Sequence, residues 1–288
     1  MRSPLKGRPD DEAKLGAFLG VYTPTVLTIL GVIMYLRLGW VTGQVGLART
    51  LLIVVIANLI TLVTTLSFSA IATNFRVGVG GAYFIISRSL GLEFGGAIGL
   101  PLFLSQALSV SLYAFGLAES LRLLWPGIPL QFVAFAIVVA VAVLALRGAQ
   151  MALRAQLPIM ALIVLSLVAL VGGAFHGPKV QTEIAHPAVA LGFWAVFAVF
   201  FPAVTGIMAG LGLSGDLRDP IKAIPRGALA ATITGFVVYL LIPIVLVRGA
   251  SPEALRENPM IWTKIAPLGV LLVMPGLWGA IFSSAVGS

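Results

Sequence analysis

Residues 26–40 read VLTILGVIMYLRLGW, and residues 197–215 read FAVFFPAVTGIMAGLGLSG. Both lie in apolar blocks long enough to cross a membrane. Each contains residues that interrupt a helix near its centre, which are Gly31 in the first and Pro202 and Gly206 in the second. Interrupted spans at corresponding places in two halves are typical of inverted-repeat transporters. The alternative is that each interruption is an ordinary kink of a membrane helix.

The rest of the chain is similarly apolar. Of the 288 residues, 59% are apolar and 10% are charged, and the mean hydropathy is +1.08. Soluble domains carry about 25% charged residues, so the composition indicates an all-α membrane protein. Eight helical spans are predicted: Gly16–Leu38, Gly46–Ala72, Phe94–Leu121, Leu130–Leu146, Ala155–Phe175, Leu191–Leu213, Gly227–Val247 and Leu268–Ser288.

The basic residues indicate an orientation in the membrane. With the N-terminus inside, eleven of the 18 Lys and Arg residues fall on the inner side and seven on the outer side. We therefore predict a cytoplasmic N-terminal segment at residues 1–15 and a transmembrane transporter domain at residues 16–288, in the plasma membrane. The net charge of +8 lies mostly in predicted loops and does not indicate binding to nucleic acid.

Several kinds of chemistry are not expected. Cysteine is absent, so neither disulfides nor thiolate metal sites are available. The sequence has no recognisable pair of nucleophile and base and no cluster of metal ligands, so we expect neither an enzyme nor a cofactor. The expected partners are transported ions and the lipid bilayer, and a homodimer is left open.

The two interruptions have the chemistry of an ion site. Half-helix N-termini present backbone N–H groups and a positive dipole end, which suit an anion. Unwound carbonyls suit a hard cation such as Na⁺ or K⁺, and Thr28 and Thr205 add hydroxyls. Neither interruption contains a carboxylate. Coordination by neutral dipoles favours ions carried as a neutral pair.

Several blocks of sequence resemble the cation–chloride cotransporters, a family of the amino acid–polyamine–organocation superfamily. The blocks are TILGVIMYLRLGWVTGQVG (28–46), SAIATNFRVGVGGAYFIISRSLGLEFGGAIGL (69–100), SLYAFGLAES (111–120), FAVFFPAVTGIMAGLGLSGDLRDPIKAIPRG (197–227) and GLWGAIFSSAVGS (276–288). This resemblance implies a five-plus-five inverted repeat whose first and sixth spans are broken. The chain stops near the end of the eighth span, so the second repeat is expected to be incomplete.

The resemblance also implies particular ligands. Potassium would be bound by carbonyls of Thr28, Ile29 and Pro202 and by hydroxyls of Tyr113 and Thr205. One chloride would lie near the amides of Gly31, Val32 and Ile33, and a second near those of Gly206, Ile207 and Met208. Sodium would be bound by carbonyls of Leu27, Leu30 and Ala280 and by hydroxyls of Ser283 and Ser284.

An outer gate is predicted from Arg37 and Glu119. At 1.5 Å per residue, Arg37 lies about 14 Å beyond Thr28 and Glu119 lies about 9 Å beyond Tyr113, so both charges reach a similar level above the site. The resemblance pairs them in the outward-closed state. The alternative is that each extends separately to the membrane interface.

Other interpretations stay open. Thr205 could bond back to its own helix, Tyr113 could be a packing aromatic, and the serine pair could serve close helix packing. Thr28 and Leu30 replace the Asn and the aromatic that are usual in the family. The predicted function is K⁺- and Na⁺-coupled chloride symport by alternating access. The alternatives are an amino-acid or polyamine permease, which the bulky neighbours of Gly31 disfavour, and a non-transporting membrane fragment.

Overall fold

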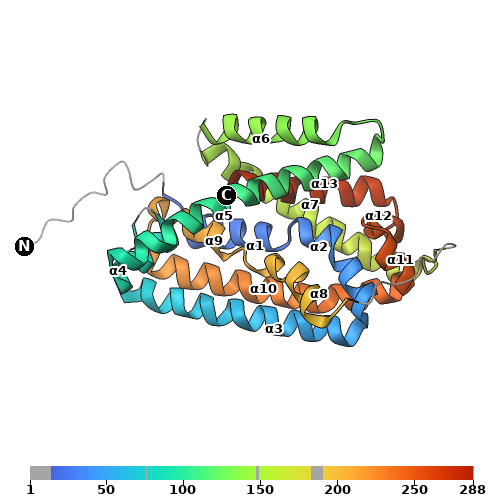
Figure 1. Cartoon of the computed structure of the whole chain (residues 1–288), viewed down its shortest axis with the longest axis horizontal. Helices are drawn as coiled ribbons and strands as arrows, with labels where there is room; N and C mark the ends of the chain where they lie inside the picture. Colours follow the sequence, from blue (N-terminus) through green and yellow to red (C-terminus); the bar gives the residue numbers. More distant parts are fainter. Residues whose placement is uncertain (1–13, 75–76, 79, 147–148, 183–190, 288) are drawn as a thin grey trace, which may run out of the picture.

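The computed structural model describes residues 14–74, 77–78, 80–146, 149–182 and 191–287. These residues are almost entirely helical, and the two backbone bridges among them are isolated (Figure 1). The helices are η2 (Phe18–Tyr22), α1 (Thr23–Ile29), α2 (Val32–Leu36), α3 (Leu38–Asn74), α4 (Gly81–Leu90), α5 (Leu92–Leu124), α6 (Leu130–Leu146), α7 (Ala149–His176), α8 (Phe193–Phe200), η3 (Phe201–Val204), α9 (Ile207–Gly212), η4 (Ser214–Asp216), α10 (Pro220–Gly249), α11 (Pro252–Glu257), α12 (Ile261–Ile265) and α13 (Gly269–Gly287).

The prediction of a polytopic all-α membrane protein is confirmed. Within the described residues, seven of the expected spans are long and apolar enough to cross a membrane. The fourth, α6, is a helix of 17 residues, or about 26 Å at 1.5 Å per residue. That length is a few ångströms short of a bilayer core of about 30 Å.

Both predicted interruptions are present. The first span consists of η2, α1 and α2, and its helix is broken at Leu30 (φ −83°, ψ 41°) and Gly31 (φ −96°, ψ −152°). The sixth span consists of α8, the 3₁₀ turn η3 and α9, and it is broken at Thr205 and Gly206. Helical pairing stops in both spans, so some backbone groups in the middle of the bundle need other partners.

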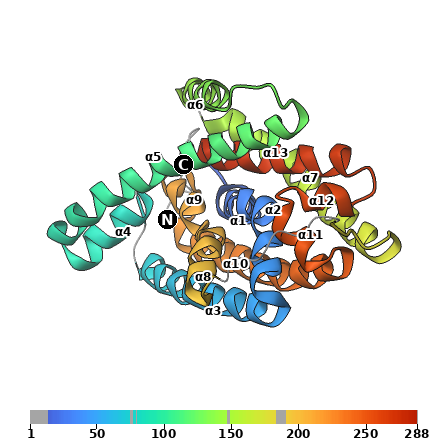
Figure 2. The same ribbon diagram turned by 45° about the vertical axis from the view of Figure 1, so that its right-hand side comes forward.

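The helices are placed as an inverted repeat requires. The second and seventh spans, α3 and α10, pack side by side, and the third span α5 packs against the eighth, α13 (Figures 1 and 2). The short helix α4 follows α3, and the short helices α11 and α12 follow α10. Figure 1 shows α4 at one end of the bundle and α11 and α12 at the opposite end. Corresponding connections thus lie at opposite membrane surfaces.

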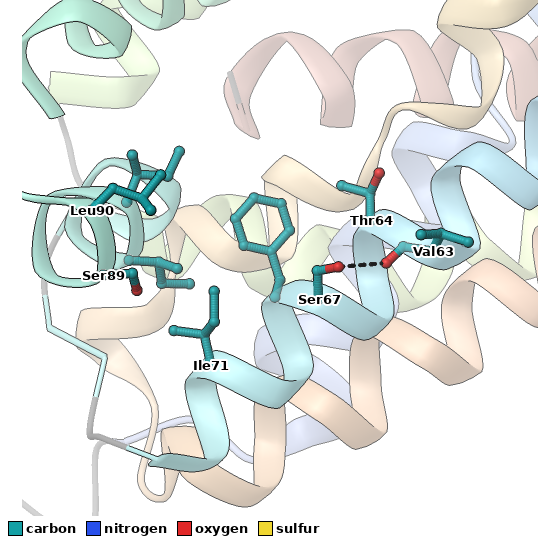
Figure 3. Close-up of a pocket in the computed structure, with 9 residues that line it drawn as sticks. Val63, Thr64, Ser67, Ile71, Ser89 and Leu90 are labelled. Carbon is teal, nitrogen blue, oxygen red and sulfur yellow. Dashed lines mark hydrogen bonds between the residues drawn. The ribbon is translucent and has the colours of Figure 1, made fainter. Parts of the chain in front are cut away.

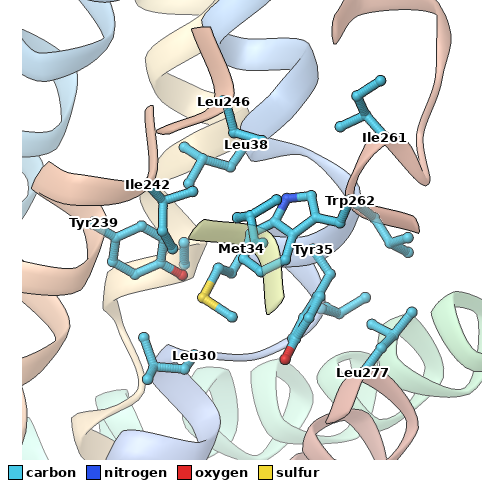
Figure 4. Close-up of a cluster of buried hydrophobic side chains, with 14 of the residues drawn as sticks. Leu30, Met34, Tyr35, Leu38, Tyr239, Ile242, Leu246, Ile261, Trp262 and Leu277 are labelled. Carbon is cyan, nitrogen blue, oxygen red and sulfur yellow. The ribbon is translucent and has the colours of Figure 1, made fainter. Parts of the chain in front are cut away.

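Large aromatic side chains lie in the middle of the buried core. Tyr35, Trp262 and Tyr239 lie in one buried cluster with aliphatic residues from the first, seventh and eighth spans (Figure 4). Tyr35 and Trp262 pack with ring centroids 4.7 Å apart, and the Tyr35 hydroxyl is 2.5 Å from Oγ of Ser166 on α7. This cluster fixes α2 against α7, α12 and α13, and so holds one half of the broken span in place.

Glycines let the sixth span approach the first. A Cβ at Gly210 of α9 would lie 2.4 Å from Oγ1 of Thr25 and 2.8 Å from the carbonyl oxygen of Val21. At Gly212, on the same helix, a Cβ would meet nothing within 4 Å. Close approach at small residues is the usual way membrane helices associate, because lipid tails are as apolar as the side chains.

We expect Gly210→Ala to destabilise the protein by about 1–3 kcal/mol, because the added methyl group overlaps α1. Gly212→Ala is the matched control and should leave stability unchanged. Thermal unfolding of the detergent-purified variants, followed by size-exclusion chromatography, measures both. Equal melting temperatures for the two variants would contradict the close packing of α9 on α1.

Candidate functional site

Residues of the two breaks and of α5 line a small, partly open cavity of about 60 Å³. Its described lining residues come from the break in the first span, from α5, and from η3 with the residue that follows it. They are Thr28, Ile29, Gly31, Val32, Ile33, Ser109, Leu112, Tyr113, Pro202, Ala203 and Thr205. All five residues predicted for potassium and all three predicted for the first chloride are therefore brought to one cavity.

Three hydroxyl oxygens of this cavity, on Thr28, Ser109 and Thr205, are available as acceptors. Thr28 Oγ1 donates to the carbonyl of Pro24 at 2.9 Å, and Thr205 Oγ1 donates to the carbonyl of Pro202 at 2.9 Å. Ser109 Oγ donates to the carbonyl of Ser105 at 2.8 Å. Because each proton is directed to a main-chain oxygen, each hydroxyl oxygen can still act as an acceptor. The alternative expected for Thr205, a bond back to its own helix, is thus present, and it leaves the oxygen able to bind a cation.

The cavity is polar without being charged. Among the described lining residues, none is Asp, Glu, Lys or Arg. A cation here would be coordinated by hydroxyl and carbonyl oxygens alone, which suits a weakly hydrated alkali ion better than a divalent metal. Without a carboxylate, a bound cation would leave an uncompensated positive charge in the site. Binding an anion beside it lowers the desolvation free energy of that charge.

The second set of predicted chloride residues lies elsewhere. Gly206 packs against the first span, where a Cβ would lie 2.9 Å from the Ile29 nitrogen. Ile207 is buried, and Met208 packs on a separate apolar cluster that includes Val21. These three residues do not line the 60 Å³ cavity. A second chloride site near them stays a prediction.

The predicted sodium residues converge in part. A Cβ at Gly31 would lie 3.6 Å from Ser284 Oγ and 3.7 Å from the Leu27 carbonyl oxygen, so both groups lie beside the first break. Ser284 is buried and donates to the carbonyl of Ala280 at 2.8 Å. The structure therefore places Leu27, Ala280 and Ser284 in one neighbourhood. Leu30 is buried at the break, and Ser283 is half-buried on α13.

Arg37 and Glu119 make contact. Nη2 of Arg37, at the end of α2, lies 3.5 Å from Oε2 of Glu119 on α5, and the two side chains are 43% and 41% exposed. The structure thus joins the two charges that the sequence placed at one level. Their role as an outer gate stays a prediction.

Sequence reasoning missed one polar residue of the cavity, Ser109. It lies four residues before Tyr113 on α5, and residues at this spacing share a face of a helix. Extending the face of Tyr113 by one turn would have found it.

A larger cavity of about 300 Å³ between α3 and α4 has a mainly aliphatic lining, including Val63, Ile71 and Leu90 (Figure 3). It offers an ion little coordination.

Comparison with known proteins places the chain in a family. Residues 20–258 match the family model described as "Amino acid permease". This chain belongs to the amino acid permease family. Within it, the predicted resemblance to cation–chloride cotransporters is confirmed by several relatives.

Three relatives are representative. The bumetanide-sensitive sodium-(potassium)-chloride cotransporter of Manduca sexta is 37% identical over 272 residues, which cover 84% of this chain and 26% of that protein. Solute carrier family 12 member 8 of Mus musculus is 34% identical over 288 residues, covering 94% and 41%. Solute carrier family 12 member 2 of Homo sapiens is 36% identical over 258 residues, covering 79% and 21%. The chain thus spans about two fifths or less of the length of each of these relatives.

If the cavity hydroxyls bind a cation, Ser109→Ala should weaken that binding. We expect the Rb⁺ concentration that gives half-maximal thermal stabilisation of the purified protein to rise about three- to tenfold, because one neutral ligand is removed. Ser111→Ala is the matched control, since Ser111 is exposed on the same helix and bonds weakly to the Ala107 carbonyl at 3.5 Å. The same Rb⁺ dependence in both variants would remove Ser109 from the site.

Proposed function

We propose that the protein is a secondary transporter that couples K⁺, and also Na⁺, to the movement of Cl⁻ by alternating access. The observation that supports this most directly is the cavity lined by residues of both breaks and of α5, where the hydroxyls of Thr28, Ser109 and Thr205 donate to main-chain carbonyls and keep their oxygens as acceptors. Thr28, Ile29, Tyr113, Pro202 and Thr205 would replace the water around K⁺. The amides of Gly31, Val32 and Ile33 would stabilise a chloride beside it.

The size of the cavity favours inorganic ions over amino acids. A volume of about 60 Å³ accommodates only a few particles the size of water, each of which needs roughly 10–15 Å³ of such space. An amino acid also needs a partner for its ammonium or its carboxylate, and the described lining residues supply no charge. Amino-acid transport, which the name of the family model suggests, is therefore the less supported function.

Sodium coupling forms part of the same proposal. Ser284, the Ala280 carbonyl and the Leu27 carbonyl lie near Gly31, so a cation could be bound by oxygens of the first and eighth spans. Ser283 and the Leu30 carbonyl would complete about five ligands. The proposal also places the N-terminus in the cytoplasm, following the positive-inside bias of the loops.

Uptake into cells that express the complete reading frame tests this function. We expect chloride-dependent ⁸⁶Rb⁺ uptake that rises with external Na⁺, and no uptake of labelled amino acids or polyamines. In the double variant Ser283→Ala and Ser284→Ala, the dependence on Na⁺ should disappear while the dependence on chloride stays. Uptake of amino acids without chloride would reject ion symport, and equal Rb⁺ uptake in Na⁺-free medium would reject sodium coupling alone.

The contact between Arg37 and Glu119 gives the proposed outer gate a test. A half-exposed ion pair contributes only about 0–1 kcal/mol, which suits a contact that must open in every cycle. We expect Glu119→Arg to lower Rb⁺ uptake severalfold, because two guanidinium groups then repel each other. Exchanging the charges, in Arg37→Glu with Glu119→Arg, should restore part of the uptake at equal surface expression. Failure of the double exchange to restore any uptake would argue that the two residues act separately.

A further inference from the structure

The break in the first span leaves a carbonyl that a distant side chain satisfies. Because α1 ends at Ile29 and α2 begins at Val32, the last carbonyls of α1 lack the partners a continuous helix would supply. The Leu30 amide still donates to the Val26 carbonyl at 2.8 Å. The Ile29 carbonyl instead accepts a hydrogen bond of 2.6 Å from the hydroxyl of Tyr239 on α10.

Close packing fixes the geometry of this bond. Tyr239 is fully buried in the cluster shown in Figure 4, and the only polar atom of its side chain, the hydroxyl oxygen, donates to the Ile29 carbonyl. Gly235, one turn earlier on α10, faces the Ile29 side chain, and a Cβ there would lie 2.6 Å from Cγ2 of Ile29. The backbone of α10 can approach this closely only because residue 235 has no side chain.

The ring of Tyr239 contacts the other interrupted span. Phe200 packs against it edge-on, with centroids 5.2 Å apart and an interplanar angle of 88°. Phe200 is the last residue of α8 and lies two positions before Pro202. One residue of the unbroken seventh span therefore contacts both interrupted spans, with its hydroxyl on one and its ring on the other.

We propose that Tyr239 is a positioning residue that orients the Ile29 carbonyl for cation binding. This inference rests on the proposed function, in which Ile29 and Pro202 supply carbonyl ligands. A carbonyl oxygen has two lone pairs, so it can accept from Tyr239 and still coordinate a cation on its other side. Tyr239 does not line the cavity, and it acts through the peptide group that it fixes. Without the hydroxyl, cation binding would have to order that peptide group itself, which weakens the affinity.

The test compares two equally buried tyrosines. Tyr239→Phe removes the hydroxyl that bonds to Ile29, while Tyr35→Phe removes a buried hydroxyl that bonds to Ser166. In the complete protein, we expect Tyr239→Phe to raise the half-saturating Rb⁺ concentration for uptake about fivefold. The maximal rate per transporter at the surface, and the half-saturating chloride concentration at saturating Rb⁺, should stay within twofold of the wild type. Tyr35→Phe should change none of these three values.

Each other outcome counts against the inference. A purely structural role would lower surface expression and maximal uptake without changing the half-saturating Rb⁺ concentration, and that result would overturn it. A lower half-saturating concentration would also overturn it, because it would mean that Tyr239 competes with the cation for the carbonyl. If Tyr239→Phe does not reach the membrane, Gly235→Ala replaces it, since the added methyl group pushes α10 away from Ile29, and the same rise is expected. Absence of chloride-dependent uptake in the wild type would reject the proposed function together with this inference.

Discussion

The structure depends on one constraint, which is that a helix interrupted inside a membrane must still satisfy its backbone groups. An unpaired N–H or C=O in hydrocarbon costs several kcal/mol, so broken helices occur only where protein encloses them. In this chain the Tyr239 hydroxyl satisfies the Ile29 carbonyl, while Thr28 and Thr205 donate to carbonyls near their own breaks. The breaks can exist because α5, α10 and α13 surround them.

Glycines make that enclosure possible. Gly206 and Gly210 on the sixth span, and Gly227 and Gly235 on the seventh, each lie where a Cβ would come within 3 Å of the first span. Among the seven long spans of the described residues, the first span is accordingly the most enclosed, with 78% of an 18-residue stretch buried, against 6% for α5. Hydrophobicity does not distinguish these spans, since both are apolar. The first span is central because its neighbours have small residues facing it.

The features that follow from local sequence were predictable, and those that follow from distant contacts were not. Gly31, Pro202 and Gly206 mark both breaks, because proline and glycine change helix geometry wherever they occur. The level shared by Arg37 and Glu119 follows from the rise per residue of a helix. The bounds of α6 were also predictable, since the predicted fourth span Leu130–Leu146 coincides with this helix.

The bond from Tyr239 to Ile29 joins residues 210 positions apart, and nothing in either local stretch points to it. The predicted sodium and second chloride residues likewise depend on how spans pack, and the packing brings only some of them together.

Alternating access needs one part of the bundle to move against another, and the contacts of the breaks differ in how readily they allow this. Arg37 and Glu119 are half-exposed, so their interaction is screened and can separate at little cost. The bond from Tyr239 to Ile29 is buried, and breaking it would leave a hydroxyl and a carbonyl unpaired, at a cost of about 1–3 kcal/mol for each group. Movement under the proposed function should therefore keep α1 with α10 and separate α2 from α5. The inner half of the first span would then move with the seventh span. The Ile29 carbonyl proposed to bind the cation would keep its position relative to Tyr239 while the contact between Arg37 and Glu119 opens.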